Sequence, residues 1–125
     1  MVVAGAAVAV VSDDNLSLAL IHLNLARRGY AVVVALLDHV EQGWQPPWPP
    51  ALLVLDLVTP DPYCWELAER VRRRHWARTP RLLLLTMCTP DAHRRISLAA
   101  HQHIHKPFTI AELVEAVKQA IAEPP

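Results

Sequence analysis

The stretch Ala-Leu-Leu-Val-Leu-Asp at residues 51–56 is an apolar run that ends in an aspartate. A short, uninterrupted apolar run is typical of a strand that is buried on both faces, as strands of parallel sheets are. Asp56 follows where this strand leaves the core, and open α/β sheets bind their ligands at that edge. The stretch therefore predicts an α/β fold with a polar site at one edge of its sheet.

Further apolar runs alternate with segments of helical periodicity on both sides of this stretch. The predicted strands are residues 2–11, 30–36, 51–55, 81–85 and 101–105. The predicted helices are residues 15–28, 38–42, 59–74, 89–100 and 109–122. This alternation predicts a parallel five-stranded sheet with helices on both faces. Right-handed crossovers would bring all the strand carboxyl ends to one edge.

Local residues support several of these boundaries. The first helix is predicted from apolar residues at helical spacing, which are Leu16, Leu20, Leu23 and Ala26. Gly29 follows as a helix stop, and Thr109 with Glu112 forms a capping box that opens the last helix.

Residues 43–50 read Gly-Trp-Gln-Pro-Pro-Trp-Pro-Pro, and prolines at this density exclude regular structure. We expect the two tryptophans of this loop, Trp44 and Trp48, to cover the edge of the core.

Length and composition limit the class of protein. The chain has 125 residues, of which 53% are hydrophobic and 19% charged, so it reads as one folded domain. Twelve basic and twelve acidic side chains cancel, which argues against direct binding of nucleic acid or of an anionic membrane. No apolar run reaches the roughly 18 residues of a membrane span. Cys64 and Cys88 form no metal or disulfide motif, so we expect a cytoplasmic protein with free thiols.

Polar side chains follow several of the predicted strands and would converge at one edge of the sheet. They are Ser12, Asp13, Asp14, Asp56, Thr86 and Lys106. Clustered carboxylates repel one another, and an all-oxygen set of this kind suits Mg²⁺. A carboxylate beside such a metal can attack phosphorus in line and form an acyl phosphate, while a lysine and a hydroxyl hold the phosphoryl oxygens.

The order of these motifs resembles the receiver domain of bacterial two-component response regulators. The family carries an acidic pair after strand one, an aspartate after strand three, Ser or Thr after strand four and Lys-Pro after strand five. The chain shows Asp13-Asp14, Asp56, Thr86 and Lys106-Pro107 in that order, and the resemblance covers about residues 8–121. It implies a doubly wound, flavodoxin-like (βα)5 sandwich of three layers with strand order 2-1-3-4-5. It also implies that Asp56 is the phospho-acceptor.

The resemblance implies a role for each of the other site residues. Asp13 would bind Mg²⁺ together with the acceptor aspartate and the backbone carbonyl of Val58. Thr86 and Lys106 would contact the phosphoryl group, and the Lys106–Pro107 peptide bond would be cis. Thr86 and His103 would be the switch residues, although the family prefers an aromatic residue at the position of His103.

The resemblance also implies partners. A sensor histidine kinase or a phosphotransfer protein would donate the phosphoryl group, and a downstream effector protein would read the switched face. That face, made by the fourth helix, the fifth strand and the fifth helix, would also be the surface of a homodimer. Residues 1–125 would be a single receiver domain without an output domain, a signalling switch rather than an enzyme.

Several residues depart from the family pattern. Counting back from Gly29, the family's two acidic positions would fall on Ser12 and Asp13, so Asp14 serves either the metal or the helix N-cap. Cys64 stands where the family usually has glycine, and Met87 stands where it prefers a small residue. These departures motivate the main alternative, a degenerate receiver that binds partners without phosphorylation.

Two further readings are weaker. A phosphatase of the haloacid dehalogenase type needs a second aspartate two residues after the nucleophile, where this chain has Val58. His101, His103 and His105 would share one face of a strand, as metal ligands can, but a polar edge that faces solvent explains them more simply.

Overall fold

The structure is a computed structural model that describes residues 6–58, 63–73, 76, 80–87 and 102–122, except for the side chains of Cys64 and Gln102. Its strands are β1 (Ala7–Ser12), β2 (Ala31–Leu36), β3 (Leu52–Leu57), β4 (Arg81–Thr86) and β5 (Gln102–His105). Its described helices are α1 (Asn15–Ala26), α2 (Leu37–Glu41), α3 (Tyr63–Arg72) and α5 (Ile110–Ala122). The predicted helix at residues 89–100 lies outside the described residues.

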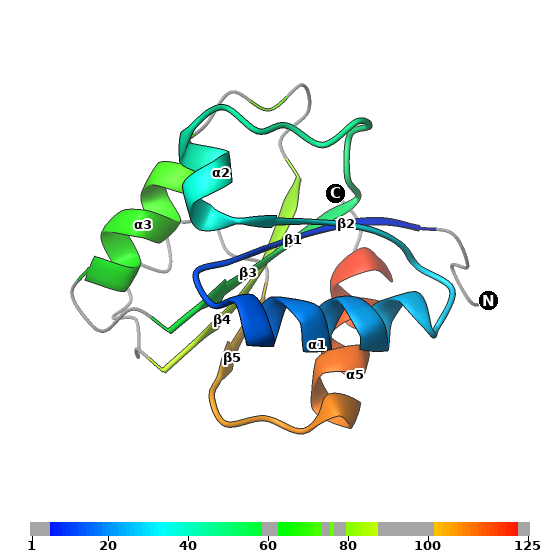
Figure 1. The fold of residues 1–125 in the computed structure, drawn as a ribbon. Coiled ribbons are helices and arrows are strands. Elements are labelled where there is room, and N and C mark those ends of the chain that lie inside the picture. Colours follow the sequence, from blue (N-terminus) through cyan, green and yellow to red (C-terminus); the bar gives the residue numbers. More distant parts are fainter. Residues whose placement is uncertain (1–5, 59–62, 74–75, 77–79, 88–101, 123–125) are drawn as a thin grey trace.

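The five strands form one parallel sheet in the order β2-β1-β3-β4-β5, as predicted. Figure 1 shows α1 and α5 on one face of this sheet and α2 and α3 on the other. Successive strand residues point to opposite faces, so Val8 and Val10 pack with α1 and α5, whereas Ala9 and Val11 pack with α2 and α3. The molecule is therefore the three-layer, flavodoxin-like sandwich that the family resemblance implied.

The helix ends follow the predicted capping residues. Thr109 Oγ1 accepts a hydrogen bond from Glu112 N at 3.1 Å and lies 3.2 Å from Glu112 Oε1, which confirms the capping box of α5. Gly29 has φ +89°, a left-handed conformation that glycine adopts without strain, and it turns the chain from α1 into β2. The Lys106–Pro107 bond is cis, as the resemblance implied.

The face that α1 turns to the core differs from the apolar stripe used to predict this helix. Leu16, Leu20 and Leu23 are 71%, 51% and 47% exposed. The buried residues of α1 are instead Leu18, Ile21 and Leu25. Because the helix is apolar on most of its surface, periodicity identified a helix but selected the wrong face.

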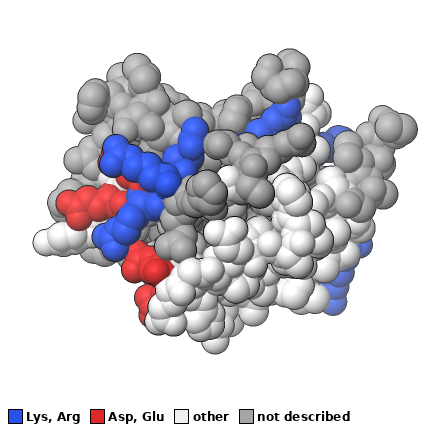
Figure 2. Space-filling view, turned by 90° about the horizontal axis from the view of Figure 1, so that it is seen from above, with Lys and Arg blue, Asp and Glu red and all other residues white. Residues whose placement is uncertain are grey.

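Surface features agree with the composition. Figure 2 shows basic and acidic side chains side by side on the side of the molecule where α2 and α3 lie. Among the described residues, ion pairs join Arg70 to Glu41 at 2.9 Å and Arg73 to Glu69 at 3.9 Å. Trp44 packs against the core between the sheet and helices α2 and α3, as expected. Within the described part of the chain, no helix is long and apolar enough to span a membrane.

Candidate phospho-acceptor site

Asp56 lies within the central strand β3 and is completely buried. Its backbone pairs with Ser12 of β1 and Leu85 of β4, so the strand continues one residue beyond the aspartate, to Leu57. The predicted strand end at residue 55 is therefore too early. A carboxylate with no exposed surface needs charged or hydrogen-bonding partners, because burial alone would disfavour its ionised form.

Both oxygens of the Asp56 carboxylate are held by partners from other elements. Lys106, just after β5, places Nζ 2.5 Å from Asp56 Oδ1, and its side chain is only 14% exposed. Ser12 Oγ donates a hydrogen bond of 2.8 Å to Asp56 Oδ2. The backbone N–H of Lys106 donates to the carbonyl of Thr86 at 3.0 Å, so the ends of β4 and β5 are also tied together.

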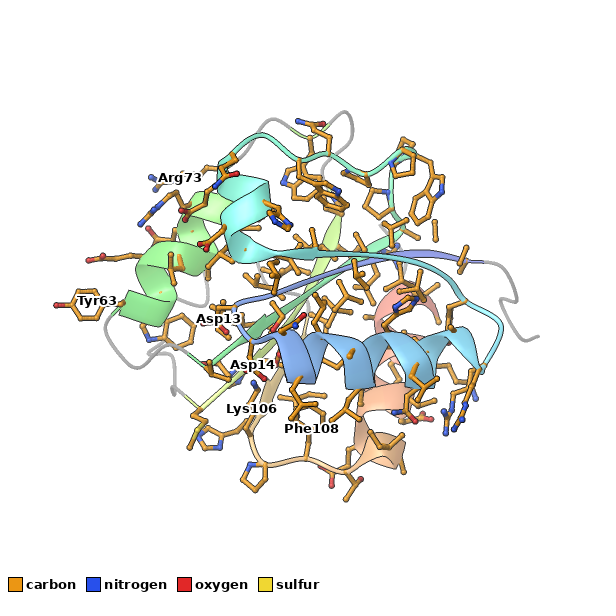
Figure 3. The ribbon with its side chains drawn as sticks, viewed as in Figure 1. Asp13, Asp14, Tyr63, Arg73, Lys106 and Phe108 are labelled. Carbon is orange, nitrogen blue, oxygen red and sulfur yellow. The ribbon has the colours of Figure 1, made fainter. Side chains whose placement is uncertain are left out.

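Asp13 lies beside the acceptor and reaches the segment that leaves β3. Its backbone N–H donates to the carbonyl of Asp56 at 3.3 Å. Its carboxylate Oδ1 accepts a hydrogen bond of 2.8 Å from the backbone N–H of Val58. The predicted metal-binding residues Asp13, Asp56 and Val58 are thus neighbours, and Figure 3 shows Asp13, Asp14 and Lys106 at the same end of the molecule, near the start of α1.

Asp14 is the N-cap of α1. Its carboxylate Oδ2 accepts a hydrogen bond of 2.9 Å from the backbone N–H of Ser17, while its own backbone is extended. Of the two roles that the sequence left open for Asp14, the capping role is confirmed.

The two predicted switch residues lie on β4 and on the neighbouring strand β5, which is at the edge of the sheet. Thr86 is the last residue of β4, is 1% exposed and pairs in register with Leu57. His103 in β5 is half-buried, and its ring centroid lies 6.4 Å from that of Trp65 in α3 at a tilt of 48°. Trp65 is 2% exposed and was not singled out from the sequence, because its contact with His103 joins elements far apart in the chain.

The donor atoms at this edge fit a magnesium ion that keeps most of its water. Carboxylates of Asp13 and Asp56 and the carbonyl of Val58 are all oxygen donors, and Mg²⁺ is commonly held by one or two carboxylates with water. Among the described residues, no three His, Cys, Asp or Glu side chains gather as a metal site. Of the described histidines of β5, His105 is exposed, as expected for an edge that faces solvent, whereas His103 is half-buried and packs near Trp65.

Met87 and Ser12, two of the residues that depart from the family pattern, differ in what they do. The side chain of Met87 is 63% exposed, so it lies on the surface rather than in the core. Ser12 is fully buried and contacts the acceptor directly. Sequence reasoning noted Ser12 only as a missing acid; the register that sets residue 12 opposite residue 56 is what reveals its contact.

Comparisons with known proteins agree with this geometry. The family model described as the response regulator receiver domain matches residues 8–118. The DNA-binding transcriptional regulator NtrC of Rhizobium meliloti (strain 1021) is 27% identical over 124 residues, which cover 96% of this chain and 25% of that protein. The chain thus spans about a quarter of the length of the curated relatives that it matches.

Two solved structures illustrate the likeness in fold. The non-phosphorylated HemR receiver domain from Leptospira biflexa superposes with a TM-score of 0.73 at 26% identity, covering 94% of this chain and 95% of that one. The chemotaxis response regulator CheY4 of Vibrio cholerae superposes with a TM-score of 0.68 at 20% identity, covering 92% of this chain and 98% of that one.

Proposed function

Because this chain belongs to the response regulator receiver domain family, a class of signalling modules rather than conventional enzymes, we propose that it is a switch whose Asp56 accepts a phosphoryl group. The donor would be a sensor histidine kinase or a phosphotransfer protein. The observation that carries this proposal is the buried Asp56 carboxylate, paired with Lys106 and set beside Asp13 at the carboxyl edge of the sheet.

The chemistry follows from the groups around the acceptor. One Asp56 carboxylate oxygen attacks phosphorus in line, the new O–P bond forms, and the bond from phosphorus to the donor nitrogen breaks. Lys106 contacts Oδ1 before transfer, so its ammonium group would lie close to the phosphoryl group once that group is bound to Asp56. There it would pair with the negatively charged phosphoryl oxygens. The hydroxyl of Thr86, at the end of the neighbouring strand, supplies the remaining hydrogen bond.

The proposed reaction also needs a divalent cation at the site. Asp13, Asp56 and the carbonyl of Val58 would hold Mg²⁺, which supplies positive charge against the phosphoryl oxygens when it is bound. The Asp13 carboxylate already accepts a hydrogen bond from the backbone N–H of Val58, so it lies beside the residue whose carbonyl would be the third ligand.

The output would be a change in the face that contains β5 and α5. When Thr86 engages the phosphoryl group, His103 on the adjacent strand would adjust against Trp65 and re-aim this face for an effector protein or a second copy of the chain. We propose a cytoplasmic location, where a kinase domain would meet it, and a single receiver domain over residues 1–125.

Intact-mass spectrometry after incubation with acetyl phosphate and Mg²⁺ tests the proposal. We expect one phosphate adduct on the wild-type chain, none on Asp56→Asn, and an unchanged adduct on Asp38→Asn, an exposed aspartate of α2 that serves as the matched control. Excess EDTA should abolish labelling. Undiminished labelling in EDTA would refute the role of Mg²⁺, and an adduct that persists in Asp56→Asn would refute the assignment of the acceptor.

One observation favours the alternative of a receiver that works without phosphorylation. Asp56 is 0% exposed and both of its oxygens are already engaged, so the resting site is closed to a donor. A wild-type chain that is folded yet takes no adduct at saturating Mg²⁺ and acetyl phosphate would support this alternative over the switch.

A further inference from the structure

Ser12 makes contacts with the acceptor that neither the family pattern nor the proposed chemistry uses. Its hydroxyl is fully buried, lies 2.8 Å from Asp56 Oδ2 and accepts a hydrogen bond of 3.0 Å from the backbone N–H of Asp14. The carbonyl of Asp14 is also 3.0 Å away. A hydroxyl has a single proton to donate, and the shorter, charge-assisted contact with the carboxylate is the stronger of the two.

These contacts join the acceptor to the start of α1. Ser12 receives a hydrogen bond from Asp14, and Asp14 in turn caps α1 through Ser17. The hydroxyl is therefore oriented by a backbone group that the helix cap holds in place. With Lys106 on Oδ1 and Ser12 on Oδ2, the plane of the Asp56 carboxylate is defined from two sides by the protein alone.

The same residue changes the charge of the site. Ser12 occupies a position where the resemblance places an acid, so the acceptor is flanked by a neutral donor instead of a second negative charge. A carboxylate at this distance from Asp56 would repel it and would need a cation between them. The affinity of an oxygen-ligand site for a divalent cation rises with the number of charged ligands.

We propose that Ser12 is a positioning residue that orients the Asp56 carboxylate before Mg²⁺ binds and, by being neutral, keeps the site's affinity for Mg²⁺ low. The positioning role rests on the proposed function, because the orientation of Asp56 matters only if Asp56 is the acceptor. The claim about affinity concerns binding of Mg²⁺ to the unphosphorylated chain and does not depend on the proposed function.

Calorimetric titration of the full chain with Mg²⁺ tests the claim that Ser12 keeps the affinity for Mg²⁺ low. We expect Ser12→Asp to bind Mg²⁺ about tenfold tighter than wild type or more, because a charged ligand is added. Ser12→Ala should bind with an affinity within about twofold of wild type, and so should Ser17→Ala, the matched control for a nearby serine of α1. Equal affinities of Ser12→Asp and wild type would overturn the claim about cation affinity.

The rate of adduct formation from acetyl phosphate at saturating Mg²⁺ tests the positioning role of Ser12. We expect Ser12→Ala to slow labelling by about tenfold through loss of an orienting hydrogen bond, while Ser12→Thr, which keeps the hydroxyl, retains most of the rate. Circular dichroism confirms that each variant is folded. Equal rates for Ser12→Ala and wild type would overturn the positioning role. A wild-type chain that takes no adduct would overturn the proposed function itself and, with it, the positioning role, while the Mg²⁺ titration would still decide the effect of Ser12 on cation binding.

Discussion

At the scale of single residues, the buried pair formed by Asp56 and Lys106 is costly to disturb. Asp56 has no exposed surface and Lys106 is 14% exposed, so each charge depends on the other for compensation. Removing one partner of a buried pair is more damaging than replacing both, because the remaining charge keeps its desolvation cost.

Lys106→Met should therefore lower the free energy of unfolding by about 3 kcal/mol, measured by urea denaturation. The matched control is Lys118→Met, which alters the chain's other lysine, an exposed residue of α5, and should change stability by less than about 0.5 kcal/mol. The double variant Asp56→Asn, Lys106→Met should be less destabilised than Lys106→Met alone. Equal losses for the two lysine variants would contradict the description of this pair as buried.

Asp14 provides a second test at this scale, because capping and metal binding predict different results. Asp14→Ala should cost about 1 kcal/mol through loss of the cap on Ser17 N–H, while Asn15→Ala, an exposed neighbour, should cost little. Affinity for Mg²⁺ should be nearly unchanged in Asp14→Ala, because the carboxylate caps the helix instead of binding the ion. A large loss of Mg²⁺ affinity without a loss of stability would instead make Asp14 a metal ligand.

At the scale of elements, the strands were easier to predict than their ends or the faces of the helices. Apolar runs identified four of the five strands, because burial of a strand leaves a strong pattern, whereas the histidine-rich β5 has no such run. The end of β3 was placed too early because the pattern stops at Asp56, whereas backbone pairing with β4 continues to Leu57. Pairing depends on residues distant in the chain, which a local pattern does not contain.

The helix α1 allows a matched test of which face is buried. Leu25→Ala should cost about 2–5 kcal/mol, since Leu25 is 0% exposed and its removal leaves a cavity between α1 and the sheet. Leu20→Ala, on the same helix but 51% exposed, should cost less than about 0.5 kcal/mol. Thermal or urea unfolding measures both, and the reverse order would show that the apolar stripe read from the sequence is the buried one.

At the scale of the whole molecule, the family resemblance and the alternation of elements together predicted the sheet order, which the structure confirms. The site was predicted as a set of positions, and the structure brings Asp13, Asp56 and Lys106 together. What sequence reasoning missed, the contact of Ser12 with the acceptor and that of Trp65 with His103, arises only when elements far apart in the chain pack side by side.

The central claim, that Asp56 accepts the phosphoryl group, is tested most directly by chemical mapping of the modified residue. After treatment with acetyl phosphate and Mg²⁺, borohydride reduces an aspartyl phosphate to homoserine, and sequencing of the peptides by mass spectrometry locates it. We expect homoserine at position 56 and at no other aspartate, and none in a sample to which acetyl phosphate was not added. Homoserine at another aspartate, or an unmodified residue 56 in a chain that carries a phosphate adduct, would contradict the account.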